Sequence, residues 1–203
     1  EMSNVSNATR GVLSLGNPSA GNAIEYITMA SSGDSVEFGD RYNDQQIGSG
    51  TIQSPTRGVF MSGYGPSPYP VNNIIDYLSF STLGNTVDFG DAQTAVRYPA
   101  ASSNAIRGVQ CGGGAPNTFT NKIEFITIAT LGNAQDFGDL TMSDLSYGGG
   151  ACASPTRMVI ATDTYTHLDY VQIMSKGNSI DFGDKTDHNA GGGGASNGHG
   201  GLG

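Results

Sequence analysis

The sequence predicts an all-β protein, a β-propeller of four blades, from three observations: a repeated block of four residues, a fixed spacing inside each repeat, and glycine-rich turns. The block reads "EFGD" at 37–40 and "DFGD" at 88–91, 136–139 and 181–184. Asp-Phe-Gly also holds magnesium in protein kinases, but a catalytic ligand is needed once per site, and the kinase motifs "HRD" and "VAIK" are missing. A block that recurs every 45 to 51 residues therefore indicates a structural repeat.

A rigid hairpin is predicted in every repeat. An acidic residue precedes the phenylalanine of the block by 13 residues in all four repeats. The connecting segments "SSGDS", "TLGNT", "TLGNA" and "SKGNS" place Gly-Asp or Gly-Asn between two apolar runs, and these residues tolerate the positive φ of a tight turn. The acids are Glu25, Asp76, Glu124 and Asp169, and the phenylalanines are Phe38, Phe89, Phe137 and Phe182.

Two further strands complete each repeat. One begins at an arginine, in "TRGVLSLG", "TRGVFMSG", "IRGVQCGG" and "TRMVIATD". The interval from this arginine to the acid varies between 12 and 19 residues, which indicates an exposed loop. The other strand is rich in small residues, in "QQIGSGTI", "AVRYPAAS" and "LSYGGGACA", and this favours the crowded innermost position of a blade. The arginines are Arg10, Arg57, Arg107 and Arg157.

The repeats predict one propeller domain over 1–203. The hairpin strands carry apolar residues on both faces, which is typical of sheets that are covered on both sides. The C-terminal segment "AGGGGASNGHGGLG" resembles the glycine-rich strand, so we expect it to pair with the first blade and close the ring; the alternative is a flexible linker. The expected blades are 6–43 with 190–200, 44–93, 94–141 and 142–189.

Repeated positions hold most of the charge, with 12 of the 18 acidic residues and four arginines. The structural interpretation is that Arg–carboxylate pairs tie neighbouring strands, that the phenylalanine fills the space between blades, and that the last aspartate of each block accepts hydrogen bonds in the next turn. These aspartates are Asp40, Asp91, Asp139 and Asp184. The alternative is a ring of carboxylates that binds Ca²⁺, but no blade supplies a ligand motif, so neither a metal nor another cofactor is expected.

Composition narrows the classes of partner. The net charge is −9, and the concentration of Lys and Arg that phosphates require is missing, so nucleic-acid binding is not expected. No apolar run reaches 18 residues, and membrane insertion is not expected either. Cys111 and Cys152 lie in different parts of the repeat and are interpreted as two small buried thiols, with a disulfide between them as the alternative.

The sequence does not predict an enzyme. The histidines His167, His188 and His199 lie in no recognisable catalytic motif. A glycosidase needs two carboxylates at a fixed separation, and the unrepeated acids form no such pair. Those acids are Glu1, Asp34, Asp44, Asp144, Asp163 and Asp187. A propeller-fold carbohydrate-active enzyme is the weaker alternative.

Binding through the variable loops is better supported. We expect the loop between the second and third strands, and the loop between blades, to emerge on the same face. Their aromatic residues stand among Pro, Gly, Asn and Thr, and a flat ring with a polar tip suits sugar or protein recognition. The candidate binding residues are Tyr64, Tyr69, Phe119, Tyr165 and His167.

The runs "IIDYLSFSTLGNTVDFGD" and "KIEFITIATLGNAQDFGDLT", each preceded by an arginine strand, resemble the repeats of kelch-like structural proteins of marine tailed phages. The resemblance covers all four repeats, and the chain departs from it at Met158, which replaces the glycine of "TRG". It implies a non-enzymatic component of the virion, such as a tail-fibre or appendage module.

The resemblance also implies partners and a location. Such a module would present its loops to a glycan or protein of the host surface, would contact other virion proteins, and would form a homo-oligomer in the extracellular particle. The alternative is a passive decoration or scaffold protein of the virion.

Overall fold

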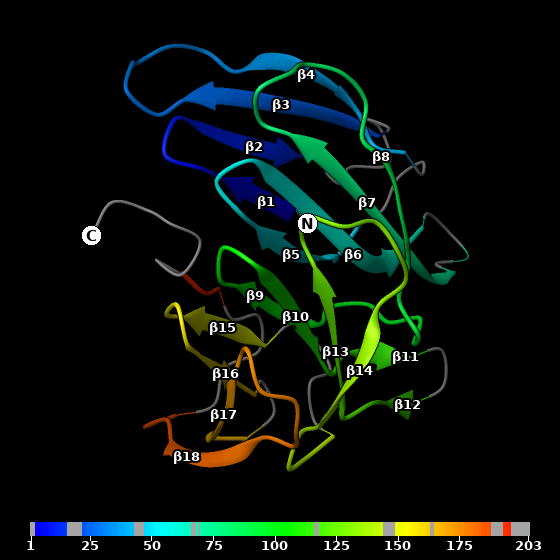
Figure 1. Ribbon diagram of the computed structural model, residues 1–203, viewed down its shortest axis with the longest axis vertical. Coiled ribbons are helices and arrows are strands. Elements are labelled where there is room, and N and C mark those ends of the chain that lie inside the picture. Colours follow the sequence, from blue (N-terminus) through cyan, green and yellow to red (C-terminus); the bar gives the residue numbers. More distant parts are fainter. Residues whose placement is uncertain are drawn as a thin grey trace.

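The computed structural model describes residues 3–15, 22–42, 47–65, 68, 70–115, 118–143, 149–162, 165–187 and 193–195. Strands and turns make up this part of the chain, and it contains no helix that is long and apolar enough to cross a membrane. Four sheets of four strands follow one another along the chain, and a short two-stranded sheet interrupts the third repeat (Figure 1). The predicted all-β class and repeated strand architecture are confirmed.

Each four-stranded sheet is an antiparallel meander. The first contains β1 (Ser3–Ser6), β2 (Arg10–Ser14), β3 (Ala23–Thr28) and β4 (Val36–Asp40). The second contains β5 (Gly50–Gln53), β6 (Arg57–Tyr64), β7 (Val71–Ser79) and β8 (Val87–Asp91). The third contains β9 (Ala100–Ser103), β10 (Arg107–Cys111), β13 (Lys122–Thr127) and β14 (Gln135–Asp139). The fourth contains β15 (Gly150–Ala153), β16 (Arg157–Ala161), β17 (His167–Gln172) and β18 (Ile180–Asp184). The small sheet pairs β11 (Gly114–Ala115) with β12 (Thr118–Phe119).

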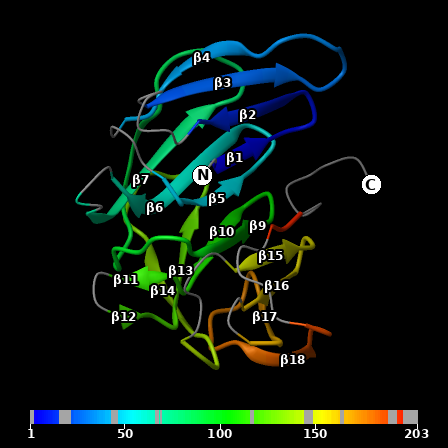
Figure 2. The same ribbon diagram turned by 180° about the vertical axis from the view of Figure 1, so that it is seen from behind.

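The prediction of a closed four-bladed ring is wrong. The 18 strands of the described residues form five separate open sheets, and none of them closes on itself. The first sheet lies at one end of the long axis of the molecule and the fourth sheet at the other (Figures 1 and 2). Neighbouring sheets meet through their short first strands, because β1 lies beside β5, β5 beside β9, and β9 beside β15.

The expected closure by the C-terminal segment fails for a local reason. The N-terminal "SNVS" itself forms β1, and β1 takes the inner position of the first sheet, where the sequence predicts the tail. Of residues 190–200, the structure describes 193–195, which form no strand. Gly194 lies against Ala151 of the fourth sheet, where an added Cβ would overlap the Ala151 carbonyl.

The core is divided into three layers, one between each pair of successive sheets. Val5 and Phe60 belong to the layer between the first and second sheets, and Ile52 and Ile126 to the next layer. The third layer joins residues of the third and fourth sheets, such as Phe137 and Met158. Each sheet therefore buries its apolar residues against its neighbours, which explains why the hairpin strands are apolar on both faces.

The repeated block forms a hydrogen-bonded junction to the turn of the next sheet. At the first junction, the Gly84 N–H donates to the Phe38 carbonyl (2.8 Å), and Asn85 Oδ1 accepts from the Asp40 N–H (3.1 Å). The same two bonds join the later sheets through Gly132–Phe89 and Asn133–Asp91, and through Gly177–Phe137 and Asn178–Asp139. The side chains of Phe38, Phe89 and Phe137 are each only 3% exposed. A phenylalanine side chain thus fills each of the three junctions.

The glycine of the block is required by the close approach of two backbones. Gly90 has φ +143°, and a Cβ on it would lie 2.6 Å from the carbonyl carbon of Gly132. No side chain fits at that distance, and few residues other than glycine adopt that φ. In the pattern Phe-Gly-Asp, the phenylalanine therefore fills the junction, the glycine allows the two backbones to approach closely, and the aspartate N–H bonds to an asparagine of the next turn.

The repeated arginines do not form the expected pairs with the repeated acids. Arg57 instead stacks on Tyr77, with the guanidinium carbon 4.8 Å from the ring centroid, and donates to the Ile128 carbonyl of the next sheet (2.8 Å). Arg10 stacks on Tyr26 and donates to the Phe80 carbonyl of the next sheet. Arg107 stacks on Phe125 and donates to the Ile173 carbonyl. A guanidinium has enough donors to cap a strand-end carbonyl while its flat face covers an aromatic ring.

The repeated acids at the 13-residue spacing lie at β-bulges, where the register between the third and fourth strands of each sheet shifts. Asp76 forms a bidentate pair with Arg41, an unrepeated arginine, and both side chains are at most 1% exposed. Glu124 accepts from the Gln93 N–H instead, and its burial without a cation raises the pKa of the carboxyl above its usual value. The bulge directs the acid into the junction, and each junction supplies a different partner.

Candidate binding face

The loops at one end of the sheets come together across the second and third repeats. The segment that enters the second sheet pairs with the end of β6, through a bridge between Ile47 and Tyr64. The segment that enters the third sheet pairs with the loop after β10, through Arg97 and Gly114. The two kinds of loop therefore share one face, which we call the loop face and define by residues 47–49, 62–64, 97–99, 112–115 and 118–119.

Two tyrosines form the centre of the loop face. The Tyr64 and Tyr98 hydroxyl oxygens are 2.6 Å apart, and their rings meet edge to face with centroids 5.3 Å apart. Gly48 packs directly against this pair, because a Cβ on it would lie 2.7 Å from the Tyr98 ring. The contact holds the two rings in one arrangement at the surface between the second and third sheets.

Backbone strain is concentrated at the same place. Ser62 (φ 59°) and Tyr98 (φ 55°) are the non-glycine residues of the described chain that have positive φ. Both conformations are over-determined by backbone bonds, since the Gly63 N–H donates to the Val96 carbonyl and the Tyr98 N–H to that of Gly48 (2.8 Å each). Residues held in such conformations gather at functional sites, where the strain keeps side chains in place for a ligand.

Three buried polar atoms lie at or just beneath the loop face without a hydrogen-bond partner in the described part of the protein. They are Ser49 Oγ, Arg97 Nε and Gln110 Oε1. The amide nitrogen of Gln110 is satisfied by Ser62 Oγ at 3.1 Å, so one half of that amide is bonded and the other is not. Buried polar groups are normally satisfied by protein atoms or by ordered water.

Phe119 and Arg97 extend the tyrosine pair into a longer strip. A Cβ at Gly114 would lie 3.2 Å from Arg97 Nε and 3.8 Å from Phe119 Cδ1, so the guanidinium and the phenyl ring flank that glycine. The Phe119 side chain is 44% exposed. Two tyrosines, an arginine and an exposed phenylalanine therefore line one side of the loop face.

The structure brings together some of the predicted binding residues and separates others. Tyr64 and Phe119 belong to the loop face. Tyr165 is exposed in the segment between β16 and β17 of the fourth sheet, and Tyr69 lies outside the described residues. Sequence reasoning missed Tyr98 and Arg97, because "AVRYPAAS" was interpreted as a strand; the Pro99 that follows them was the available signal for a loop.

His167 lies in a polar cluster at the junction of the third and fourth sheets. Its Nε2 atom is 2.8 Å from Thr141 Oγ1 and 2.9 Å from Asp169 Oδ1. Thr141 and Asp169 both contact Nε2, and the other ring nitrogen, Nδ1, lies 3.9 Å from Asp181 Oδ1, beyond hydrogen-bond distance. The cluster fixes a strand end, and His167 does not form part of the loop face.

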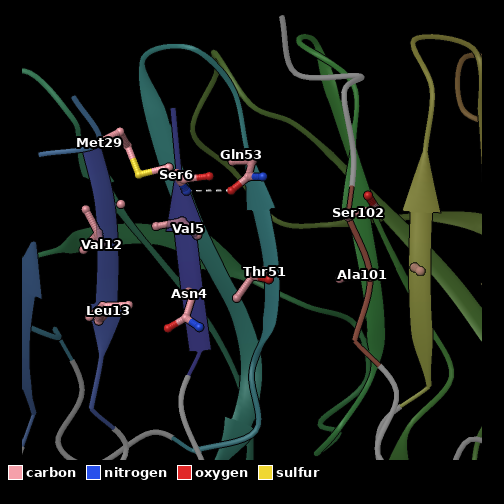
Figure 3. A pocket seen from close by; sticks show the side chains of 14 residues that line it. Asn4, Val5, Ser6, Val12, Leu13, Met29, Thr51, Gln53, Ala101 and Ser102 are labelled. Atoms are coloured by element: carbon pink, nitrogen blue, oxygen red, sulfur yellow. Dashed lines mark hydrogen bonds between the residues drawn. The ribbon is translucent and has the colours of Figure 1, made fainter. Parts of the chain in front are cut away.

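Apart from the loop face, a hollow with a volume of about 340 Å³ lies between the inner strands of the sheets, among them β1, β5 and β9 (Figure 3). Its polar side chains include Asn4, Gln53 and Ser102, and the residues that the structure describes contribute no charged side chain to its lining. Gln53 Oε1 accepts from the Ser6 N–H (2.7 Å), which ties β1 to β5 across the hollow.

The described residues contain no group of three or more His, Cys, Asp or Glu side chains that could hold a metal ion. Binding of Ca²⁺ therefore remains an alternative that no ligand set supports.

Comparisons with known proteins inform the fold. No family model and no curated protein matches the sequence. Among solved structures, that of YjhT matches 93% of this chain with a TM-score of 0.74 at 9% sequence identity. The match spans 66% of the YjhT chain, slightly less than two thirds. At this identity the similarity concerns the arrangement of the sheets alone.

Proposed function

We propose that this chain is a non-enzymatic recognition module of a virion, in a tail fibre or another appendage, and that its loop face binds a glycan of the host surface. The location in a virion rests on the resemblance of the repeats to structural proteins of marine tailed phages. The binding role rests on the loop face itself, and above all on the Tyr64–Tyr98 pair held in a strained backbone above buried polar atoms that lack protein partners.

The chemistry of the loop face suits a sugar. Aromatic rings contact the apolar face of a pyranose, and hydroxyl, amide and guanidinium groups bond its hydroxyls. Tyr64, Tyr98 and Phe119 supply the rings, while Arg97 and Gln110 supply the polar groups. A rigid face of this kind loses little conformational entropy when it binds.

A glycan array probed with the purified 203-residue chain tests the binding role. We expect Tyr98→Ala and Phe119→Ala each to weaken binding of the best glycan by about tenfold or more. Leu131→Ala is the matched control, because Leu131 is 56% exposed in the hairpin turn at the other end of the third sheet. Thermal unfolding of each variant identifies any loss that is due to misfolding.

Two results would overturn the binding role. One is retention of binding in a folded Tyr98→Ala/Phe119→Ala double variant, and the other is the absence of glycan binding by the wild-type chain. The second result, combined with labelling of particles by an antibody against this chain, would favour the passive decoration protein. An antibody that labels infected lysates but no purified particles would contradict the location in a virion.

A further inference from the structure

The two end sheets expose the two halves of the junction that joins every pair of neighbouring sheets. At each of the three internal junctions, the repeated block and arginine of one sheet engage the turn and third strand of the next. Among the described residues, no sheet packs against the block and arginine of the fourth sheet, and none packs against the turn of the first sheet. We call these the fourth-sheet end surface (Cys152, Arg157 and Phe182–Asp184) and the first-sheet end surface (Gly11, Ile27, Met29 and Gly33–Ser35).

The fourth-sheet end surface is uncovered where its counterparts are buried. Phe182 is 49% exposed, against 3% for the phenylalanines of the other three blocks. A Cβ at Gly183 would meet no atom within 4 Å, whereas at Gly138 it would lie 2.4 Å from the next turn. Arg157 stacks on Tyr170 as the other arginines do, but in the described residues it donates to no carbonyl of another sheet.

The first-sheet end surface is uncovered in the same way. Met29 is 57% exposed, whereas the residues at its position in the next three sheets are at most 2% exposed. Those residues are Phe80, Ile128 and Ile173. Ile27 is 36% exposed, and its counterparts Leu78, Ile126 and Val171 are at most 3% exposed. Gly33 occupies the position of Gly84 in the turn, but Gly84 has φ +140° whereas Gly33 does not have a positive φ.

We infer that these two surfaces bind each other between two copies of this chain, head to tail. Three internal junctions show that block and turn of this sequence fit together, and each chain carries one free half of each kind. The Gly33 N–H would donate to the Phe182 carbonyl of the other copy, and Asp34 would accept from the Asp184 N–H, as Asn178 does from Asp139. Arg157 would cap the Met29 carbonyl, as Arg107 caps that of Ile173.

Side-chain size supports the same pairing. At the internal junctions a residue of the inner strand packs on the position that follows the arginine: a Cβ at Gly58 would lie 2.5 Å from Val5, and one at Gly108 would lie 2.3 Å from Ile52. The corresponding residues at the ends are Cys152, which is exposed and not buried as the sequence predicts, and Gly11, which is buried beside Ile27 and Met29 of its own sheet, so the pair again matches a side chain with a glycine. Head-to-tail contacts of this kind end in a ring if the rotation between copies closes and in a filament if it does not.

Sedimentation velocity over a range of concentrations tests the inference. We expect the wild-type chain to associate, and Met29→Asp and Phe182→Asp each to weaken the association at least ~30-fold. Both side chains are exposed in the single chain, so both variants are expected to fold. Ile106→Asp is the matched control, because Ile106 is 57% exposed outside both end surfaces, and we expect it to associate like the wild type.

Mixing the two variants distinguishes this geometry from any other. Met29→Asp retains an intact fourth-sheet end surface, and Phe182→Asp retains an intact first-sheet end surface. We therefore expect an equimolar mixture to form a 1:1 dimer with one junction, while each variant alone stays monomeric. A wild-type chain that is monomeric at every concentration, or a mixture that does not pair, would overturn the inference. Glycan binding on the array is a separate readout, so its failure and this failure can be told apart.

Discussion

At the scale of single residues, one repeated position serves three different purposes. The acid that precedes the block by 13 residues binds Arg41 when it is Asp76, a backbone N–H when it is Glu124, and a threonine and a histidine when it is Asp169. The bulge aims each carboxylate at the junction, and the preceding sheet decides what it meets. A carboxylate at this position can therefore stabilise the junction even when no arginine is its partner.

The Arg41–Asp76 pair allows the sharpest test at this scale. Asp76→Asn keeps the shape but leaves the buried Arg41 guanidinium without its counter-charge, and we expect the free energy of unfolding to fall by about 3–5 kcal/mol. Chemical denaturation measures this change. Asp139→Asn breaks the exposed pair with Lys122 and serves as the control, with an expected change of about 0.5 kcal/mol or less. Equal effects of the two substitutions would contradict the assignment.

At the scale of the elements, neighbouring sheets have complementary side-chain sizes at the positions where the inner strand of one faces the second strand of the next. Val5 and Ile52 of β1 and β5 face Gly58 and Gly108 of the next sheets. At the third junction the order is reversed, because the small Ser102 of β9 precedes a sheet that carries Met158, whose side chain is fully buried. The loss of glycine from "TRG" in the fourth repeat is thus explained by the residue on the neighbouring inner strand.

Because the side-chain sizes at facing positions are complementary, we expect the effects of substitutions at positions 52 and 108 on the free energy of unfolding to be strongly coupled. Gly108→Met would drive a side chain into Ile52, at an expected cost of about 1–3 kcal/mol or more. Ile52→Ser alone would leave a cavity at a similar or larger cost. The double variant recreates the pair found at the third junction, and we expect it to be about 1–3 kcal/mol more stable than the sum of the single effects. Additive effects in a double-mutant cycle by denaturation would show that the two sites do not touch.

At the scale of the whole molecule, the sequence predicted the repeat unit better than the assembly of units. The 13-residue spacing located the hairpins, because a hairpin of fixed length has little freedom, and the Gly-Asn turns marked its tip. Closure was mispredicted because it depends on the rotation between sheets, which arises from many small contacts such as Val5 on Gly58. The loop face was found only in part, since the pairing of Tyr64 with Tyr98 joins residues 34 positions apart in two different sheets.

The exposed end surfaces should also affect the rates of amide hydrogen exchange. The amide hydrogens of Asp40, Asp91 and Asp139 are held by asparagines of the following sheet, whereas that of Asp184 has no such partner among the described residues of a single chain. In dilute solution we therefore expect the Asp184 amide to exchange with solvent at least about tenfold faster than the Asp139 amide, as measured by NMR-detected hydrogen exchange. Raising the protein concentration should slow exchange of the Asp184 amide in the wild type but leave it unchanged in Phe182→Asp. Only the wild-type fourth sheet can bind the first sheet of another copy. Equal protection of Asp184 and Asp139 in the dilute sample would mean that the fourth sheet already has a neighbour within its own chain.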